Sequence, residues 1–224
     1  MQPIIAFHNK PEIKQFYLDR AKAHFEADEI VKGKYWEDGK GCAVGCLVHS
    51  SSHQKLAEEI NIPVEMAYLI DRLFEGLPNG VSKSFPVRFL ESINIGSDLS
   101  LVMDRYFLAL LSDEKEGAIL SANEIVRSSI KNVIDLFKRV ISGDFPSQDE
   151  WQIAYSAADS AADSAADSAA YSAACRAADS AAYSAAYSAA CSAACRAADS
   201  AAHFIWQSEL LLKLLAEAPV KDSQ

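Results

Sequence analysis

The stretch that decides the fold class is YSAADSAADSAADSAAYSAACRAADSAAYSAAYSAACSAACRAADSAAH, which runs from Tyr155 to His203. Every fourth residue varies and is followed by Ser-Ala-Ala, except where Arg176 and Arg196 replace the serine. Alanine is the strongest helix former, and neither Gly nor Pro occurs within residues 147–218. We therefore predict one long helix over this range and, with the helical patterns that precede it, an all-α fold.

The period of the repeat determines what surface this helix offers. An α-helix has about 3.6 residues per turn, so a period of four moves each variable residue about 40° around the axis. The variable residues form a slow spiral beside alanines, whose small side chains permit close approach of a second helix. The repeat holds five Asp and two Arg, too few opposite-charge pairs for a free-standing helix. We expect a protein partner, or a second copy of the chain, to cover it.

Aromatic side chains on this helix are expected to make most of that contact, because each alanine buries little apolar area. The predicted interaction residues are Tyr155, Tyr171, Tyr183, Tyr187, Phe204 and Trp206. An alternative interpretation is that the repeat is a spacer produced by repeat expansion, in which Ala and Ser are harmless filler.

Residues 1–146 are predicted to form a helical domain, and residues 219–224 a disordered tail. Apolar residues upstream of the repeat recur at three- and four-residue steps, and no long alternating β-branched run occurs. Ser-X-X-Glu sequences at Ser121 and Ser147 have the spacing of a helix capping box. The helices expected in this domain cover about residues 11–31, 53–60, 63–76, 86–93, 98–111 and 121–141.

A cluster of Cys and His residues follows a glycine-rich loop in the sequence GCAVGCLVHSSSH, residues 41–53. Thiolate and imidazole groups are ligands that zinc prefers. On a straight helix the four side chains would span about 16 Å, too far for one zinc ion. A zinc site therefore needs Gly45 to break the helix so that the two pairs converge. The predicted ligands are Cys42, Cys46, His49 and His53.

The same cluster is compatible with a thiol-dependent enzyme. Cys42 is expected at a helix N-terminus, where the helix dipole lowers the pKa of a thiol. His49 or His53 would then act as the base, oriented by Asp71 or Glu75.

A purely structural interpretation of the cluster is also open. The two cysteines would be small core residues, and the two histidines would be partly exposed polar residues. In that case Asp71 and Glu75 belong to a solvated face, and Tyr35, Trp36 and Phe74 belong to the core.

Composition narrows the class of partner. The chain has 224 residues and a net charge of -10, without the clustered Lys and Arg that phosphate contacts need, so we predict no nucleic-acid partner. No stretch of about 18 apolar residues occurs, which predicts no membrane span. Five cysteines without a signal peptide indicate reduced thiols and a cytoplasmic location.

The segments KYWEDGKGCAVGC (residues 34–46) and FEGLPN (residues 74–79), followed by the Ala-rich repeat, resemble a group of uncharacterised bacterial and phage proteins. The likeness covers nearly the whole chain but implies no mechanism. The Ala-rich tail is also similar to immunity proteins of toxin systems, which implies an inhibitory binding role. We predict a non-catalytic interaction protein that uses the repeat helix for self-association or protein binding. The alternative is a small metal- or thiol-dependent enzyme centred on the Cys/His cluster.

Overall fold

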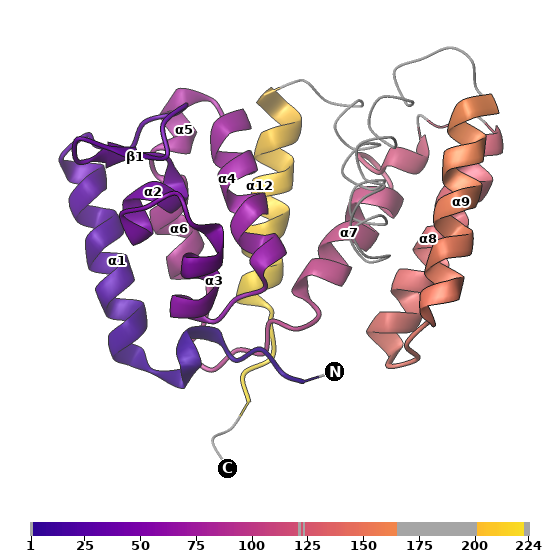
Figure 1. Ribbon diagram of the computed structural model, residues 1–224, viewed down its shortest axis with the longest axis horizontal. Coiled ribbons are helices and arrows are strands. Elements are labelled where there is room, and N and C mark those ends of the chain that lie inside the picture. The colour runs from indigo at the N-terminus through magenta and orange to yellow at the C-terminus, as the bar shows by residue number, and fades with distance from the viewer. Residues whose placement is uncertain (1, 121, 123, 165–200, 222–224) are drawn as a thin grey trace. The chain divides into compact units, whose positions relative to one another are not determined.

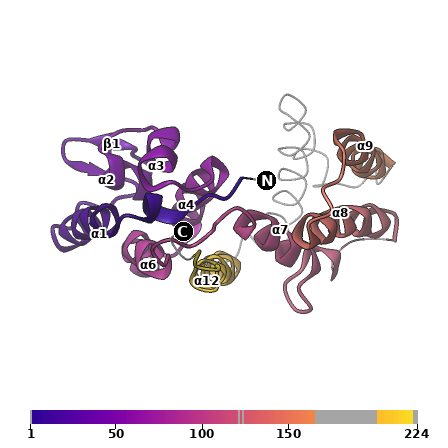
Figure 2. The ribbon, with the colours of Figure 1, turned by 90° about the horizontal axis from the view of Figure 1, so that it is seen from below.

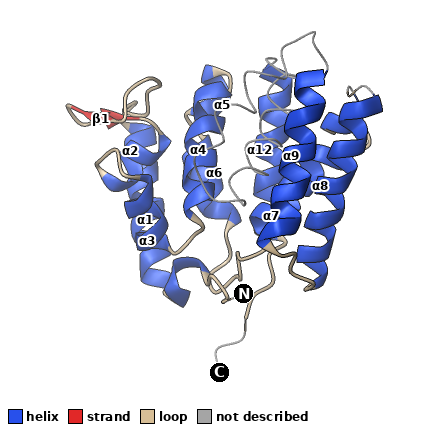
Figure 3. Ribbon diagram, turned by 45° about the vertical axis from the view of Figure 1, so that its right-hand side comes forward, coloured by secondary structure: helices blue, strands red, loops and turns tan. Residues whose placement is uncertain are grey.

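The computed structural model describes residues 2–120, 122, 124–164 and 201–221 (Figure 1). Within these ranges the fold is all-α, with ten α-helices and one two-stranded sheet (Figure 3). This confirms the predicted fold class, whereas most of the predicted repeat helix lies outside the described residues. None of the described helices is both long and apolar enough to cross a bilayer. The chain divides into two compact units.

The first unit comprises residues 1–103 and 204–224. Helix α1 packs against α2 and α6, and α4 packs against α2, α3 and α6 (Figure 2). Leu47, Phe74 and Phe89 are among its fully buried core side chains. Its elements are η1 (Ala6–Asn9), α1 (Pro11–Glu26), β1 (Trp36–Glu37), β2 (Lys40–Gly41), α2 (Ala43–Val48), α3 (His53–Ile60), α4 (Val64–Gly76), α5 (Asn79–Ser82), α6 (Phe85–Ser92) and most of α12 (Ala201–Ala216).

Helix boundaries in the first unit follow the sequence closely. The predicted helix over residues 53–60 matches α3, and those over 63–76 and 86–93 match α4 and α6 within one residue. Helix α1 ends at Glu26 instead of near residue 31, because Asp28 adopts a left-handed backbone conformation with a φ of 55°.

The second unit comprises residues 104–203. It contains most of α7 (Val102–Ser112), η2 (Ala118–Leu120), α8 (Glu124–Ser142) and α9 (Gln148–Ser164). Helices α8 and α9 pack against each other, and the rings of Phe137 and Trp151 meet edge to face with centroids 5.2 Å apart. The predicted domain boundary after residue 146 falls in the loop that joins these two packed helices.

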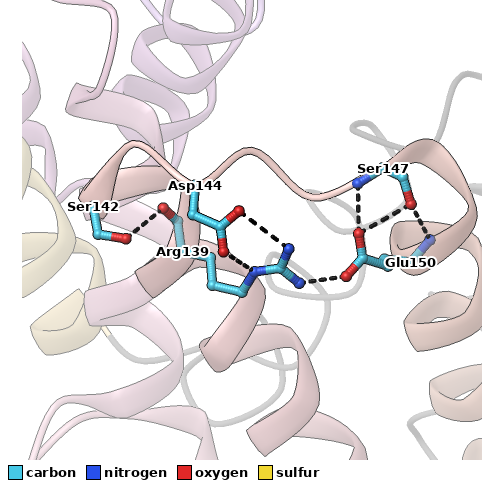
Figure 4. Close-up of polar contacts among 5 residues, drawn as sticks. All are labelled: Arg139, Ser142, Asp144, Ser147 and Glu150. Atoms are coloured by element: carbon cyan, nitrogen blue, oxygen red, sulfur yellow. Dashed lines mark hydrogen bonds and ion pairs between the residues drawn. The ribbon is translucent and has the colours of Figure 1, made fainter.

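The start of α9 carries the predicted capping box (Figure 4). Ser147 Oγ accepts a hydrogen bond from the Glu150 backbone N–H at 3.2 Å, and the Glu150 carboxylate accepts one from the Ser147 N–H at 2.7 Å. Arg139 of α8 donates to Asp144 and to Glu150, so the loop between the helices is tied to both. The capping box at Ser147 is therefore confirmed, and the one predicted at Ser121 lies outside the described residues.

The chain that precedes α2 lies directly on the first turn of this helix. Strands β1 and β2 pair Trp36 with Gly41. A Cβ atom at Gly45 would lie only 1.4 Å from the Tyr35 carbonyl oxygen, so this close approach requires glycine. Gly45 lies inside α2, so the helix break that a zinc site at this cluster would require does not occur. Its role is to seat the Tyr35 loop against α2.

Candidate functional site

The two described cysteines belong to the first turns of α2. Cys42 is the N-cap residue, and its sulfur accepts a hydrogen bond from the Gly45 N–H at 3.4 Å. The Cys46 thiol donates to the Gly41 carbonyl at 3.3 Å. Their exposed fractions are 1% and 0%, and both thiols are free.

Burial makes both thiols poor nucleophiles. It raises the pKa of Cys42 and of Cys46 to about 12, and a hydrogen bond from the Cys42 thiol to the Asp71 carboxylate adds to the effect at Cys42. The expectation that a helix N-terminus lowers the pKa of Cys42 is wrong. Helix α2 has only six residues, and the loss of hydration outweighs the backbone N–H groups that favour the thiolate.

A pocket of about 210 Å³ lies beside α4, and we call it the Asp71 pocket. Its lining residues are Gly33, Lys34, Tyr35, Cys42, Asp71 and Glu75. Asp71 Oδ2 lies 3.3 Å from His53 Nε2. Asp71 Oδ1 is buried and has no N–H or O–H donor among the described residues. A buried carboxylate oxygen without such a donor is costly, and the neighbouring Cys42 thiol supplies only a weak S–H donor to this carboxylate.

The other charged groups of the pocket are already paired. Both Glu75 carboxylate oxygens accept from the Gly33 N–H, at 3.0 and 3.2 Å. Lys34 Nζ lies 2.8 Å from the Glu37 carboxylate. The Glu75 contacts hold the loop before β1 on α4, and Asp71 is the pocket carboxylate whose partners among the described residues are His53 and the Cys42 thiol.

Aromatic rings surround the His53–Asp71 pair. His53 is 7% exposed, and its ring stacks on Tyr68 with centroids 4.3 Å apart. Tyr35 meets His53 edge to face at 5.9 Å. Tyr35, which lines the pocket, and Tyr68, which stacks on His53, are 52% and 55% exposed, so both rings are open to solvent.

These positions correct the purely structural interpretation at three residues, the first being His53, which was expected to be partly exposed but is only 7% exposed. Tyr35 was expected in the core but is half exposed, whereas Phe74 is fully buried as expected and Trp36 is half-buried. Asp71 was expected on a solvated face, but its side chain is only 15% exposed because it lies against His53 and Cys42. Glu75 is exposed, as that interpretation requires.

A second polar cluster, which we call the histidine pair, consists of His24 of α1 and His49 at the end of α2. Their Nε2 atoms lie 2.9 Å apart. The other ring nitrogen of His24, Nδ1, lies 2.6 Å from a Glu29 carboxylate oxygen. Trp36 stacks on the His49 ring with a centroid distance of 4.3 Å. Partial burial and the positive charges nearby, chiefly that of Arg20, lower the pKa of His49 and so favour its neutral form.

The structure does not bring the four predicted zinc ligands together. Helix α2 continues through Gly45, His49 faces His24, and His53 faces Asp71. Across the ranges that the structure describes, no group of three or more His, Cys, Asp or Glu side chains is placed to hold a metal ion.

The predicted interaction residues have different positions. Phe204 is half-buried in α12, and a Cβ atom at Gly76 would lie 2.1 Å from its ring, so Phe204 packs within its own chain. Trp206 is also half-buried in α12. Tyr155 lies in α9, whereas the predicted contacts of Tyr171, Tyr183 and Tyr187 lie outside the described residues.

Sequence reasoning missed His24 and Glu29 as partners of the cluster. His24 lies 25 residues before His49, and packing of α1 against α2 brings the two rings together. No local spacing signals this contact.

Comparison with known proteins does not supply a family. No family model, no curated protein and no solved structure matches the chain.

Proposed function

We propose that the protein is a non-catalytic interaction protein that binds a protein partner by taking a Lys or Arg side chain into the Asp71 pocket. The observation that carries this proposal is the Asp71 carboxylate, which lines the pocket and whose partners in the described part of the chain are His53 and the weak thiol donor of Cys42. An ammonium or guanidinium group supplies strong N–H donors together with the opposite charge.

The surroundings of the pocket favour a protein partner. Tyr35 lines the pocket, and Tyr68 stacks on the adjacent His53. Tyrosines that are half exposed are enriched at protein interfaces, where they supply a large contact area. A cation in the pocket would also lie close to the Tyr35 ring, which attracts positive charge.

The net charge of the chain supports the same choice of partner. At -10, the charge attracts a basic protein and speeds its association. Nucleic acid and anionic membrane surfaces would be repelled.

The repeat is the second contact surface in this proposal. Its four tyrosines, at residues 155, 171, 183 and 187, would cover the Ala-rich helix by self-association or by binding the partner. This part of the proposal rests on the sequence, as does the cytoplasmic location indicated by the odd number of cysteines.

The alternative function is a thiol- or metal-dependent enzyme centred on Cys42, Cys46, His49 and His53, and it has less support. A nucleophilic thiol needs access and a low pKa. Cys42 is 1% exposed, and its pKa is raised to about 12.

Titration with small basic probes tests the pocket. N-acetyl-lysine amide and N-acetyl-arginine amide should shift the NMR amide signals of residues 33–35 and of α4 in the labelled full chain. The neutral, similarly shaped N-acetyl-norleucine amide should not. Asp71→Asn should abolish the shifts, whereas Asp19→Asn, which removes an equal charge from an exposed site on α1, should preserve them. Equal binding of the norleucine probe, or unchanged binding in Asp71→Asn, would disprove the proposal.

Light scattering tests the repeat separately. If the tyrosines mediate self-association, the full chain should exceed the monomer mass, and replacement of the four tyrosines by alanine should restore it. Replacement of Asp159, Asp163, Asp167 and Asp179 by alanine is the matched control and should leave the mass unchanged. A monomeric parent chain would remove self-association and leave only the heterologous partner.

A further inference from the structure

We propose that the histidine pair binds a divalent transition metal such as Zn²⁺, at a site separate from the Asp71 pocket. Two imidazole nitrogens from different helices, His24 Nε2 and His49 Nε2, face each other at 2.9 Å. Imidazole is a preferred ligand for zinc, copper and nickel. His49 was among the ligands predicted from sequence. His24 was not, and in this proposal it takes the place of the predicted cysteine ligands.

The spacing of the rings fits chelation without movement of the backbone. A metal that lies 2.0–2.1 Å from each nitrogen at a tetrahedral angle places two imidazole centroids roughly 5 Å apart. The centroids of His24 and His49 are 5.1 Å apart, with ring planes at 80°. If the two rings tilt about their centroids, both Nε2 atoms can bind one metal ion instead of contacting each other.

The polar partners of the two rings also suit metal binding. His24 Nδ1 lies 2.6 Å from the Glu29 carboxylate, on the opposite side of the ring from the Nε2 atom that faces His49. A carboxylate behind a histidine orients the ring and raises its basicity as a metal ligand. Metal ligation requires both Nε2 atoms to offer a lone pair, so the ion would displace the hydrogen that the two atoms now share at 2.9 Å.

The rings are held in place before any metal arrives. Trp36 stacks on His49 with an interplanar angle of 9°. His49 is the C-cap residue of α2, with a φ of 50°, and its N–H bonds to the Gly45 carbonyl at 2.8 Å. Preorganised ligands lose less entropy on binding, and the exposure of His49 gives the ion access from solvent.

Two features set the character of the site. The two histidines provide two protein ligands, one fewer than zinc sites with an open position usually have, so water or a partner side chain must supply the remaining two. Arg20 and Lys55 repel a metal ion at His49, and Glu29 offsets part of this repulsion. We therefore expect a reversible site and not a permanently filled structural one.

Zinc titration of the full chain tests the site. The parent for this experiment carries Cys175→Ser, Cys191→Ser and Cys195→Ser, which remove the thiols of the repeat as competing ligands. Calorimetry with Zn²⁺ alone should detect one equivalent. His24→Ala and His49→Ala should each abolish it, and Glu29→Gln, which retains both ligands, should weaken it by about 10-fold or more. His8→Ala, at an exposed histidine bonded to the Glu58 carbonyl, is the matched control and should bind normally.

Copper spectroscopy counts the nitrogen ligands directly in the parent chain, so it tests the site even if an alanine variant folds poorly. The paramagnetic resonance spectrum of the Cu²⁺-loaded parent should show two nitrogen donors, and that of His24→Gln should show one. Absence of a one-equivalent site in the parent, normal binding by the His24 or Glu29 variants, or a single nitrogen donor in the parent would each overturn the proposal. Such results would leave the Asp71 pocket untouched, since that proposal is tested by organic cations.

Discussion

The Asp71 pocket of the first unit differs in exposure from the Arg139 cluster of the second unit, in which Arg139 donates to the Asp144 and Glu150 carboxylates. In the pocket, the Asp71 side chain is 15% exposed, and burial raises the pKa of the adjacent Cys42 to about 12. In the Arg139 cluster, the Glu150 side chain is 42% exposed, and its ion pair with Arg139 lowers its pKa to about 2. Burial thus dominates the pKa of Cys42 in the pocket, whereas ion pairing dominates the pKa of Glu150 in the cluster. The buried pocket therefore contains a carboxylate oxygen without an N–H or O–H donor among the described residues. In the exposed cluster, by contrast, Arg139 already donates to both carboxylates.

The largest expected effect is the protection of the buried thiols. A rise in pKa from 9.0 to about 12 lowers the thiolate fraction of Cys42 and Cys46 at pH 8 by about 1000-fold. In the variant that lacks the three repeat cysteines, native-state alkylation should therefore be at least that much slower than after unfolding in guanidinium. Native labelling within 10-fold of the unfolded rate would show that burial does not control this cluster.

The next effect tests how the first unit builds its pocket. Gly45→Ala places a Cβ atom 1.4 Å from the Tyr35 carbonyl oxygen, so backbone must move. We expect a loss of about 3 kcal/mol in the free energy of unfolding, measured by urea denaturation with circular dichroism. The basic probes should also bind more weakly, because Tyr35 lines the pocket.

The matched control for this substitution is Gly80→Ala. A Cβ atom at Gly80 meets nothing within 4 Å, and the residue lies in α5, where alanine is favoured over glycine. Its stability should equal or slightly exceed that of the parent. Similar losses of stability in both variants would mean that the close contact between the Tyr35 backbone and α2 contributes little to the free energy of unfolding.

Much of the fold follows from local patterns in the sequence. Pro63 and the apolar spacing after it predict α4, and Ser147 with Glu150 predicts the start of α9 through a short-range capping contact. Such signals act within one or two helical turns, so they can be read without knowledge of the tertiary structure.

The candidate site was predictable only in part, because its contacts are non-local. The sequence indicates Cys42, His53 and Asp71 as chemical candidates, but not the 1% exposure that raises the thiol pKa of Cys42. Gly45 illustrates the difficulty, since glycine within a helical pattern usually signals a break. Here it marks the close approach of a loop, which becomes visible only when Tyr35 is placed against α2.

A smaller effect is expected at the start of α9 in the second unit. Ser147→Ala removes the hydroxyl that accepts the Glu150 N–H, and loss of such a cap costs about 1 kcal/mol. Ser142→Ala is the control, because its hydroxyl makes a contact to the Arg139 carbonyl at an exposed site and should change stability by less than about 0.5 kcal/mol. Thermal denaturation compares the two. A larger loss at Ser142 would contradict the importance of the capping box.

The smallest effect concerns acid and the exposed Arg139 cluster. The pKa of Glu150 is lowered from 4.5 to about 2 in the folded protein, so the unfolded chain binds its proton more readily. The stabilising contribution of this residue is therefore complete above about pH 4.5 and is lost as the pH falls toward 2. Carbon NMR of the Glu150 carboxyl should follow this titration, and Arg139→Gln should move it back toward the ordinary value.

Added salt should change the pKa of Glu150 in the exposed cluster but not the pKa of Cys42 in the buried pocket. At 1 M NaCl the screening length is about 3 Å, so the Glu150 pKa should rise toward 4.5. Desolvation of a thiol does not depend on ionic strength in this way, and the slow alkylation of Cys42 should persist at the same salt concentration. Faster alkylation of Cys42 in salt, together with an unchanged Glu150 titration, would contradict this account. It would mean that ion pairing controls the pKa of Cys42 and that burial controls the pKa of Glu150.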